Sequence, residues 1–241
     1  MKKSFFAFMM MAAMLMVACG DKQKNNGKPI DSDKLRGKAT ATTKADAAPA
    51  SSDDPFGIAS VRKAWTGNPI DVDAGDVNRG IKQFAIAFCE EYPQVRTNEA
   101  MLNYFMSECK KNELYDIISK PRNGYARCIM RVETTQLTEV CYWNRQNDHK
   151  LFAAFMTAAS ESGEEDNLVV FYDYDPATDV LTPEPELTNM IERRVKGYDS
   201  YAVDLPDEGK DIVIHAYTVD KENDSAESDD TTLKWNGMSF E

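Results

Sequence analysis

The chain has only two histidines in 241 residues, and its five cysteines form no CxxC pair. His149 and His215 stand in no metal-binding spacing such as HExxH, and the cysteine spacing excludes a thioredoxin-like redox pair and a clustered zinc site. A serine nucleophile elbow, a phosphate-binding glycine loop and a dinucleotide fingerprint are also absent. The sequence therefore predicts no cofactor and no metal, and it contains no motif that identifies a reaction.

Positive charge is also scarce, because 28 Lys and Arg residues face 40 Asp and Glu residues, giving a formal net charge of -12. Such a chain repels phosphate backbones, and no basic stripe or nucleic-acid motif offsets that repulsion. The composition excludes DNA and RNA as partners.

The first apolar run, residues 5–18, is shorter than the roughly 18 to 20 residues that a permanent membrane helix requires. It follows Lys2 and Lys3 and ends at Cys19, which is the order of a charged n-region, an apolar h-region and a cleavage site. We expect residues 1–18 to be a secretory signal peptide rather than a retained anchor.

The residues Met16-Val17-Ala18-Cys19 resemble the lipobox of bacterial lipoproteins, although Met16 stands where that family more often has leucine. The resemblance implies a diacylglyceryl group on Cys19, commonly with a third acyl chain such as palmitate on its amine, and two chains suffice for stable anchoring. Gly20 in place of an aspartate favours the outer membrane. An ordinary signal peptide ending near Ala18 is the alternative.

Beyond the cysteine, residues 19–53 contain few large apolar side chains and cannot bury enough surface to offset their ordering entropy. We interpret them as the lipidated cysteine and a flexible tether. Apolar content rises from residue 54 onward, so residues 54–241 are predicted to form a single domain. Two small domains, helical and then sheet-like, are the alternative.

Hydrophobic spacing within the domain predicts helices first and strands afterwards. Helical spacing covers residues 54–67, 77–92 and 97–109, with a further helical turn at 114–118. We expect strands at residues 125–133, 137–144, 150–158, 167–174, 179–182, 199–204, 211–219, 231–235 and 238–241, and one helix at 186–195. This order predicts an α+β domain with N-terminal helices packed on a mainly antiparallel β-sheet.

Two hairpins follow from turn residues. Asn236-Gly237 suits a type I′ turn, which would pair Trp235 with Met238 and Leu233 with Phe240. A reversal around Thr134-Thr135 would place Cys128 opposite Cys141, at a separation that suits a disulfide.

The second possible disulfide joins Cys89 to Cys109. It is harder to form, since in a simple antiparallel helix pair these residues would miss each other by roughly 15 Å. Buried free thiols are the alternative for all four cysteines of the domain.

Candidate chemical groups are few. Glu139 is predicted to face inward beside Cys141, where burial would raise its pKa. The carboxylates of residues 173–179 could collect calcium, but Asp and Pro are also what a tight turn requires. Residues 71–76 depart from the EF-hand pattern, and helix capping by Asp73 or Asp76 explains them better.

Surface features indicate binding more than catalysis. The acidic runs 161–166 and 220–230 would be solvated loops or docking sites for a basic partner. Aromatic residues on the predicted strands would either stack on a ligand or be covered by a second layer; they are Tyr142, Trp143, Phe171, Tyr172, Tyr174, Tyr217 and Trp235. We therefore expect a lipid-anchored envelope protein that binds a protein, a glycan or an envelope component. The alternatives are a carboxylate-based envelope hydrolase and a structural accessory lipoprotein.

Overall fold

The computed structural model describes residues 54–73, 79–107, 114–131, 134–160, 165–220 and 225–241. Within these ranges the domain is mixed α+β and consists mostly of sheet, which confirms the predicted class. The predicted signal peptide, Cys19 and the tether lie outside the described residues.

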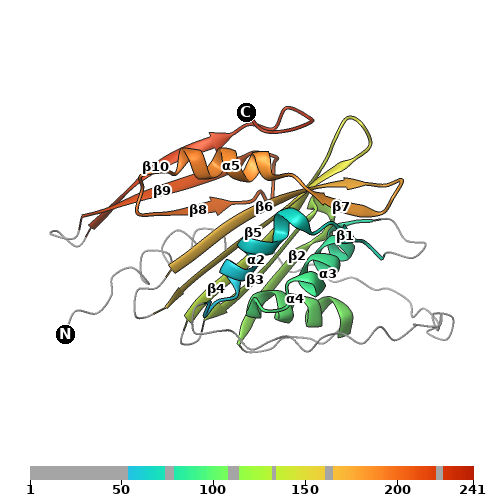
Figure 1. The fold of residues 1–241 in the computed structure, drawn as a ribbon, viewed down its shortest axis with the longest axis horizontal. Coiled ribbons are helices and arrows are strands. Elements are labelled where there is room, and N and C mark those ends of the chain that lie inside the picture. Colours follow the sequence, from blue (N-terminus) through green and yellow to red (C-terminus); the bar gives the residue numbers. More distant parts are fainter. Residues whose placement is uncertain (1–53, 74–78, 108–113, 132–133, 161–164, 221–224) are drawn as a thin grey trace, which may run out of the picture.

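A seven-stranded antiparallel sheet forms the centre of the domain, in the order β1-β7-β6-β5-β4-β3-β2. Its strands, listed in chain order, are β1 (Ile70–Asp71), β2 (Tyr115–Lys120), β3 (Tyr125–Arg131), β4 (Thr134–Asn144), β5 (Lys150–Ser160), β6 (Glu165–Asp175) and β7 (Val180–Pro183). Strands β2 to β7 follow one another as a meander (Figure 1). Residues 115–118 are strand, so the predicted helical turn there is wrong.

Three helices cover one face of this sheet: α2 (Ile58–Ala64), α3 (Ile81–Glu91) and α4 (Arg96–Ser107). Asp54 caps the first of them, because its carboxylate accepts hydrogen bonds from the N–H groups of Ala59 and Ser60. Helix α3 begins after Gly80, so Asp73 does not cap it, and Asp76 lies outside the described residues.

The core beneath these helices consists of aromatic side chains from α3 and the sheet. Phe84 and Phe88 of α3 are fully buried against the ring of Phe152, at centroid distances of 5.9 and 5.7 Å, and Phe88 also contacts Tyr172 at 6.2 Å. Burying rings of this size accounts for much of the stability of the interface.

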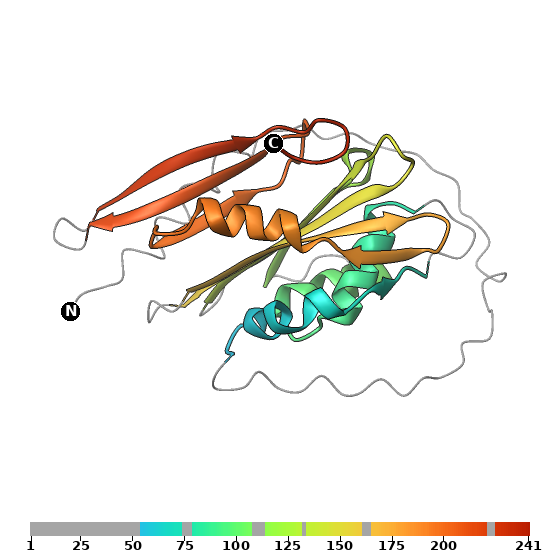
Figure 2. The ribbon, with the colours of Figure 1, turned by 45° about the horizontal axis from the view of Figure 1, so that its top comes forward.

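The opposite face of the sheet carries a second layer, formed by helix α5 (Pro185–Arg194) and a three-stranded antiparallel sheet. That sheet has the order β10-β9-β8, with β8 (Ser200–Asp204), β9 (Ile212–Asp220) and β10 (Ser225–Leu233). Figure 2 shows the central sheet between the two layers. Strands β5 and β6 are therefore buried on both faces, which explains their nearly continuous apolar sequence.

The C-terminal hairpin differs from its prediction. Trp235 pairs with Phe240 rather than with Met238, and Lys234 exchanges backbone hydrogen bonds with Glu241. A type I′ turn needs positive φ at two successive residues, but here only Gly237 has it. Instead, the side-chain oxygen of Asn236 accepts hydrogen bonds from the N–H groups of Met238 and Ser239, and the loop is wider than a two-residue turn.

Candidate functional site

Glu139 on β4 is a carboxyl group buried between the central sheet and the segment that follows β8. The Tyr125 hydroxyl donates a hydrogen bond to its Oε1 at 2.7 Å, and the Leu205 N–H donates to its Oε2 at 3.4 Å. Arg127 is its direct partner on β3 and places Nη1 4.0 Å from Oε1. The structure confirms the expectation that this acid is buried, and it lies two residues from Cys141 on the same face of β4.

The pKa of Glu139 is raised to about 7, chiefly by burial and to a smaller extent by the nearby Asp204 carboxylate. The Tyr125 hydrogen bond, Arg127 and the Leu205 N–H oppose that shift because they stabilise the charged form. A carboxyl group with a pKa near 7 could transfer protons. Both of its oxygens are held by protein donors, however, so in this arrangement the group serves the contact between layers.

A second polar cluster centres on Arg145, whose side chain is only 8% exposed. Its guanidinium group bonds to Asp173 and to both carboxylate oxygens of Glu184, at 2.8 and 2.7 Å, while Nε donates to the Met238 carbonyl. His149 places Nδ1 2.7 Å from the same Asp173. The cluster joins the β4–β5 hairpin to β6, to the start of α5 and to the C-terminal loop.

This cluster was not predicted from the sequence. Its carboxylates Asp173 and Glu184 lie 28 and 39 positions from Arg145, and no local spacing relates them to it. Only the strand register brings them together. The one feature of the sequence that pointed to this cluster was the position of His149 beside a predicted turn.

His215 lies on the outer face of the three-stranded sheet and joins its three strands. Its Nε2 is 3.1 Å from Asp204 on β8, and its Nδ1 is 2.8 Å from Asp230 on β10. These two carboxylates raise the pKa of His215 to about 9 against the opposing effect of burial. Both ring nitrogens are engaged with carboxylates, so the ring serves to join the three strands.

The predicted disulfide between Cys128 and Cys141 is wrong. Cys128 pairs with Thr138, and Cys141 pairs with Tyr125, a shift of three positions from the predicted register. An odd shift places the two cysteines on opposite faces of the sheet, one in each core.

Both of these cysteines and Cys89 are free thiols buried in the core, while Cys109 lies outside the described residues. Burial raises the pKa of Cys128 to about 12 and those of Cys89 and Cys141 well above the ordinary value. Thiols of this kind are unreactive because the thiolate is disfavoured.

The acidic turn after β6 is held by protein contacts. Asp175 accepts hydrogen bonds from the Ala177 N–H and the Thr178 hydroxyl, and Asp179 pairs with Arg79 at 2.6 Å. The described residues contain no group of three or more His, Cys, Asp and Glu side chains placed to hold a metal ion. Residues 176–179 form the expected turn, and the side chain of Asp175 stabilises it.

Most of the strand aromatics are covered, as expected if layers lie on both faces of the sheet. Trp143, Phe171, Tyr172 and Tyr174 are buried. Tyr142, Tyr217 and Trp235 are half-buried, and Trp235 stacks on Trp143 with ring centroids 5.9 Å apart. The central sheet thus offers no broad aromatic surface among its described residues.

The three-stranded sheet forms the outermost layer of the domain (Figures 1 and 2). Its inner face contributes Val203, Ile214 and Leu233 to the second core. Its outer face carries Tyr217 and Val219, which are half-buried and belong to neither core.

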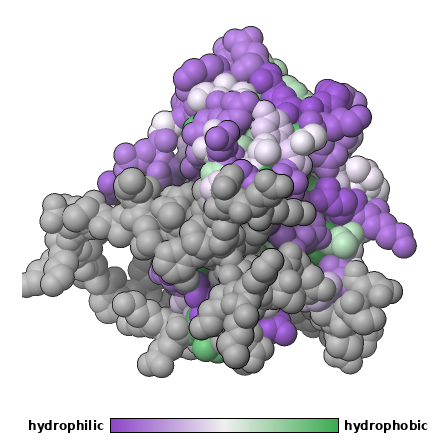
Figure 3. Space-filling view, turned by 90° about the vertical axis from the view of Figure 1, so that its left-hand side faces the viewer, coloured by the Kyte–Doolittle hydropathy of each residue, from purple (hydrophilic) through white to green (hydrophobic). Residues whose placement is uncertain are grey.

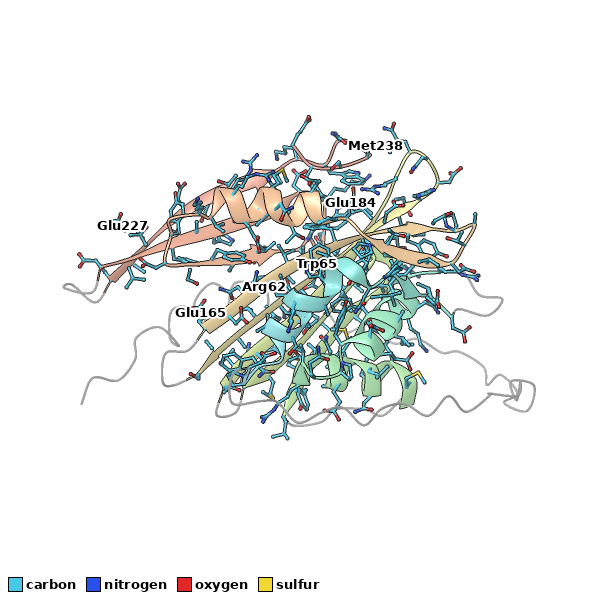
Figure 4. All side chains as sticks on the ribbon, in the orientation of Figure 1. Arg62, Trp65, Glu165, Glu184, Glu227 and Met238 are labelled. Atoms are coloured by element: carbon cyan, nitrogen blue, oxygen red, sulfur yellow. The ribbon has the colours of Figure 1, made fainter. Side chains whose placement is uncertain are left out.

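Strands β9 and β10 extend beyond β8 as a two-stranded arm. β8 pairs with β9 only as far as Tyr217, whereas Thr218 to Asp220 pair only with β10. Figure 4 shows Glu227 near the end of this arm, directed away from the body of the domain. The end of the molecule that carries the arm is mostly hydrophilic in its upper part (Figure 3).

The sequence predicts this strand only from residue 231, but β10 begins at Ser225, so residues 225–230 of the acidic run are strand rather than loop. Glu227, Asp229 and Asp230 are all exposed on it. Asp229 accepts a hydrogen bond from the Tyr198 hydroxyl at 2.6 Å. The acidic charge could be predicted from the sequence but the strand could not, because Asp and Glu have low β-propensity.

Comparisons with protein families, curated proteins and solved structures find no match to this chain. None of the helices in the described ranges combines the length and the apolarity needed to cross a membrane.

Proposed function

We propose that the protein is a lipid-anchored component of the bacterial cell envelope, held in the outer membrane by Cys19, and that its domain binds a protein, glycan or envelope component without catalysing a reaction. The support for the anchor is the order of Lys2 and Lys3, the apolar run 5–18 and the lipobox-like residues before Cys19. The tether of residues 20–53 would give the domain reach from the membrane.

The open three-stranded sheet is the observation that carries the binding function. The central sheet is covered on both faces, while the outer layer ends in an arm whose side chains are largely exposed. Glu139, whose pKa is raised, and His215 both form hydrogen bonds with other groups of the protein. This distribution favours a binding surface over a reaction centre.

The anchor is tested by fractionating cells that produce the Cys19→Ala variant. The variant domain should stay folded but leave the membrane fraction, while a matched Cys109→Ala variant should remain there. A Cys19→Ala protein that still sediments with membranes after a high-salt wash would disprove the anchor.

Binding is tested by crosslinking in intact cells, followed by mass spectrometry. A reproducible adduct on the three-stranded sheet supports a binding module. A domain that forms no adduct with any envelope component from any of its surfaces would contradict the proposal.

A carboxylate hydrolase is the second candidate, and the pKa of Glu139 near 7 is the observation that favours it. Hydrolysis of model esters or glycosides that disappears in Glu139→Gln but persists in Glu208→Gln would support this activity. The matched control removes an equivalent charge from a side chain that is 80% exposed.

A further inference from the structure

The outer edge of β10 is the longest strand edge in the described domain. Strand β10 has nine residues, and all of its strand pairing is with β9. Of the other edges, β1 has two residues and β2 has six, while Lys120 at the end of β2 bonds to Asp207 at 2.5 Å. Strand β8 is joined to β6 by the hydrogen bond from Tyr201 to the Asn167 carbonyl.

An edge strand presents a row of backbone N–H and C=O groups that can pair with another extended chain. This edge is also accessible from both faces, because the consecutive residues 227–230 of β10, whose side chains alternate between the two faces, are all exposed. The side chains that flank the edge are short or acidic, and most of them are exposed. An added strand would therefore meet no bulky apolar side chain.

Charge determines which extended chain fits. Glu227 and Asp229 are two residues apart on one face of β10, and residues 54–241 contain 19 Lys and Arg against 35 Asp and Glu. A second copy of the same edge would be repelled by like charges placed opposite each other. A basic strand would gain attraction at the same positions.

We propose that the outer edge of β10 binds an extended, lysine- or arginine-rich segment of a partner protein, which adds to the three-stranded sheet as a fourth strand. This inference rests on the proposed binding function and names its surface and its partner chemistry. Backbone pairing would supply the register, and the carboxylates would select a basic sequence.

The first experiment measures binding of a fluorescent nine-residue peptide that alternates lysine with threonine or valine. The protein is the mature chain carrying Cys19→Ala, which removes the lipid. Binding should weaken as salt rises, and it should weaken about tenfold or more when alternate peptide amides are N-methylated, because methylation removes the ladder hydrogen bonds but keeps the charge. Equal binding of the methylated peptide, or no binding of either peptide, would overturn the proposal.

Charge reversal locates the site. The double variant Glu227→Lys/Asp229→Lys should lower the affinity for the peptide about tenfold. The control Asp71→Lys/Asp116→Lys makes the same charge change on exposed residues of β1 and β2, the two edge strands of the central sheet, and should leave the affinity within about twofold. Equal weakening in both variants would mean that net charge, not β10, attracts the peptide.

A photoreactive residue at Ser228 on β10, compared with one at Lys82 on α3, separates this inference from the proposed function in intact cells. Adducts with a basic segment of another protein at Ser228 support the inference. Adducts at Lys82 alone would refute the β10 site but leave a binding function, and adducts at neither position would count against both. An adduct between Ser228 and the chain's own basic stretch, residues 22–44, would overturn the proposed partner, because the tether of the same chain would then occupy the β10 edge.

Discussion

Glu139→Gln should make the domain more stable at high pH. In the folded state the pKa of this acid rises from its ordinary 4.5 to about 7, so the folded protein holds the proton more tightly than the unfolded chain does. The resulting stabilisation is fully present below about pH 4.5 and is lost as the pH rises through about 7. At about 1.4 kcal/mol per pKa unit, this loss amounts to about 3 kcal/mol.

The magnitude depends on burial, because desolvation is the largest cause of the pKa shift and the side chain is 9% exposed. Glutamine resembles the protonated acid and cannot ionise, so the variant does not lose this contribution. Its amide can still accept the Tyr125 hydrogen bond, but it leaves the weaker Leu205 contact at 3.4 Å without an acceptor. A constant cost of about 1 kcal/mol is expected from that loss at every pH.

Urea unfolding followed by tryptophan fluorescence is a suitable assay, since Trp143 belongs to the same core cluster as Leu137 and Cys141 on β4. The difference in unfolding free energy between variant and wild type should shift in favour of the variant by about 3 kcal/mol between about pH 4.5 and pH 8.5. Glu208→Gln, on an exposed side chain, should show no such shift. Parallel pH profiles for wild type and Glu139→Gln would refute the reasoning.

Three further predictions concern the other titratable and buried groups. His215→Ala should lower the melting temperature below about pH 6.5 and have little effect above about pH 9, because the pKa of His215 is raised in the folded state and the protonated ring is therefore the stabilising form. An equal loss of melting temperature at both pH values would contradict this. Cys89, Cys128 and Cys141 should resist a thiol reagent until the protein unfolds, and peptide mapping without reductant should find no bridge between the last two; rapid labelling in the native state would show that the cores are wrongly assigned. Arg145→Met should lower the free energy of unfolding in urea by about 3 to 5 kcal/mol, since it leaves the partly buried carboxylates of Asp173 and Glu184 unpaired. A loss below about 1 kcal/mol would show that Arg145 does not stabilise the fold in this way.

Helices and strands with regular apolar spacing could be predicted from the sequence. The stripe Ile81, Phe84 and Phe88 predicts α3 because a period of 3.6 places these residues on one face. Residues 186–195 were expected to be helical, and α5 occupies Pro185–Arg194. Local periodicity carries this information whatever the residues later contact.

Register could not be predicted in the same way. A hairpin centred near residue 133 and one centred between 134 and 135 both alternate apolar residues, yet only the first places Glu139 opposite Arg127. The choice depends on which face packs on α3 and α4 and which packs on the three-stranded sheet. The disulfide prediction failed for this reason, since an odd shift reverses the face of every side chain.

By itself, the sequence determined the acidic charge, the absence of recognisable catalytic motifs, the helical stripes and most of the strands, because each depends on composition or on neighbours within a few residues. Only the tertiary structure decided that both faces of the central sheet are covered, that Glu139 lies against Leu205, and that an acidic strand ends the outer sheet. These features join residues that are tens of positions apart. Their physical cause is the packing of whole layers, which no local pattern encodes.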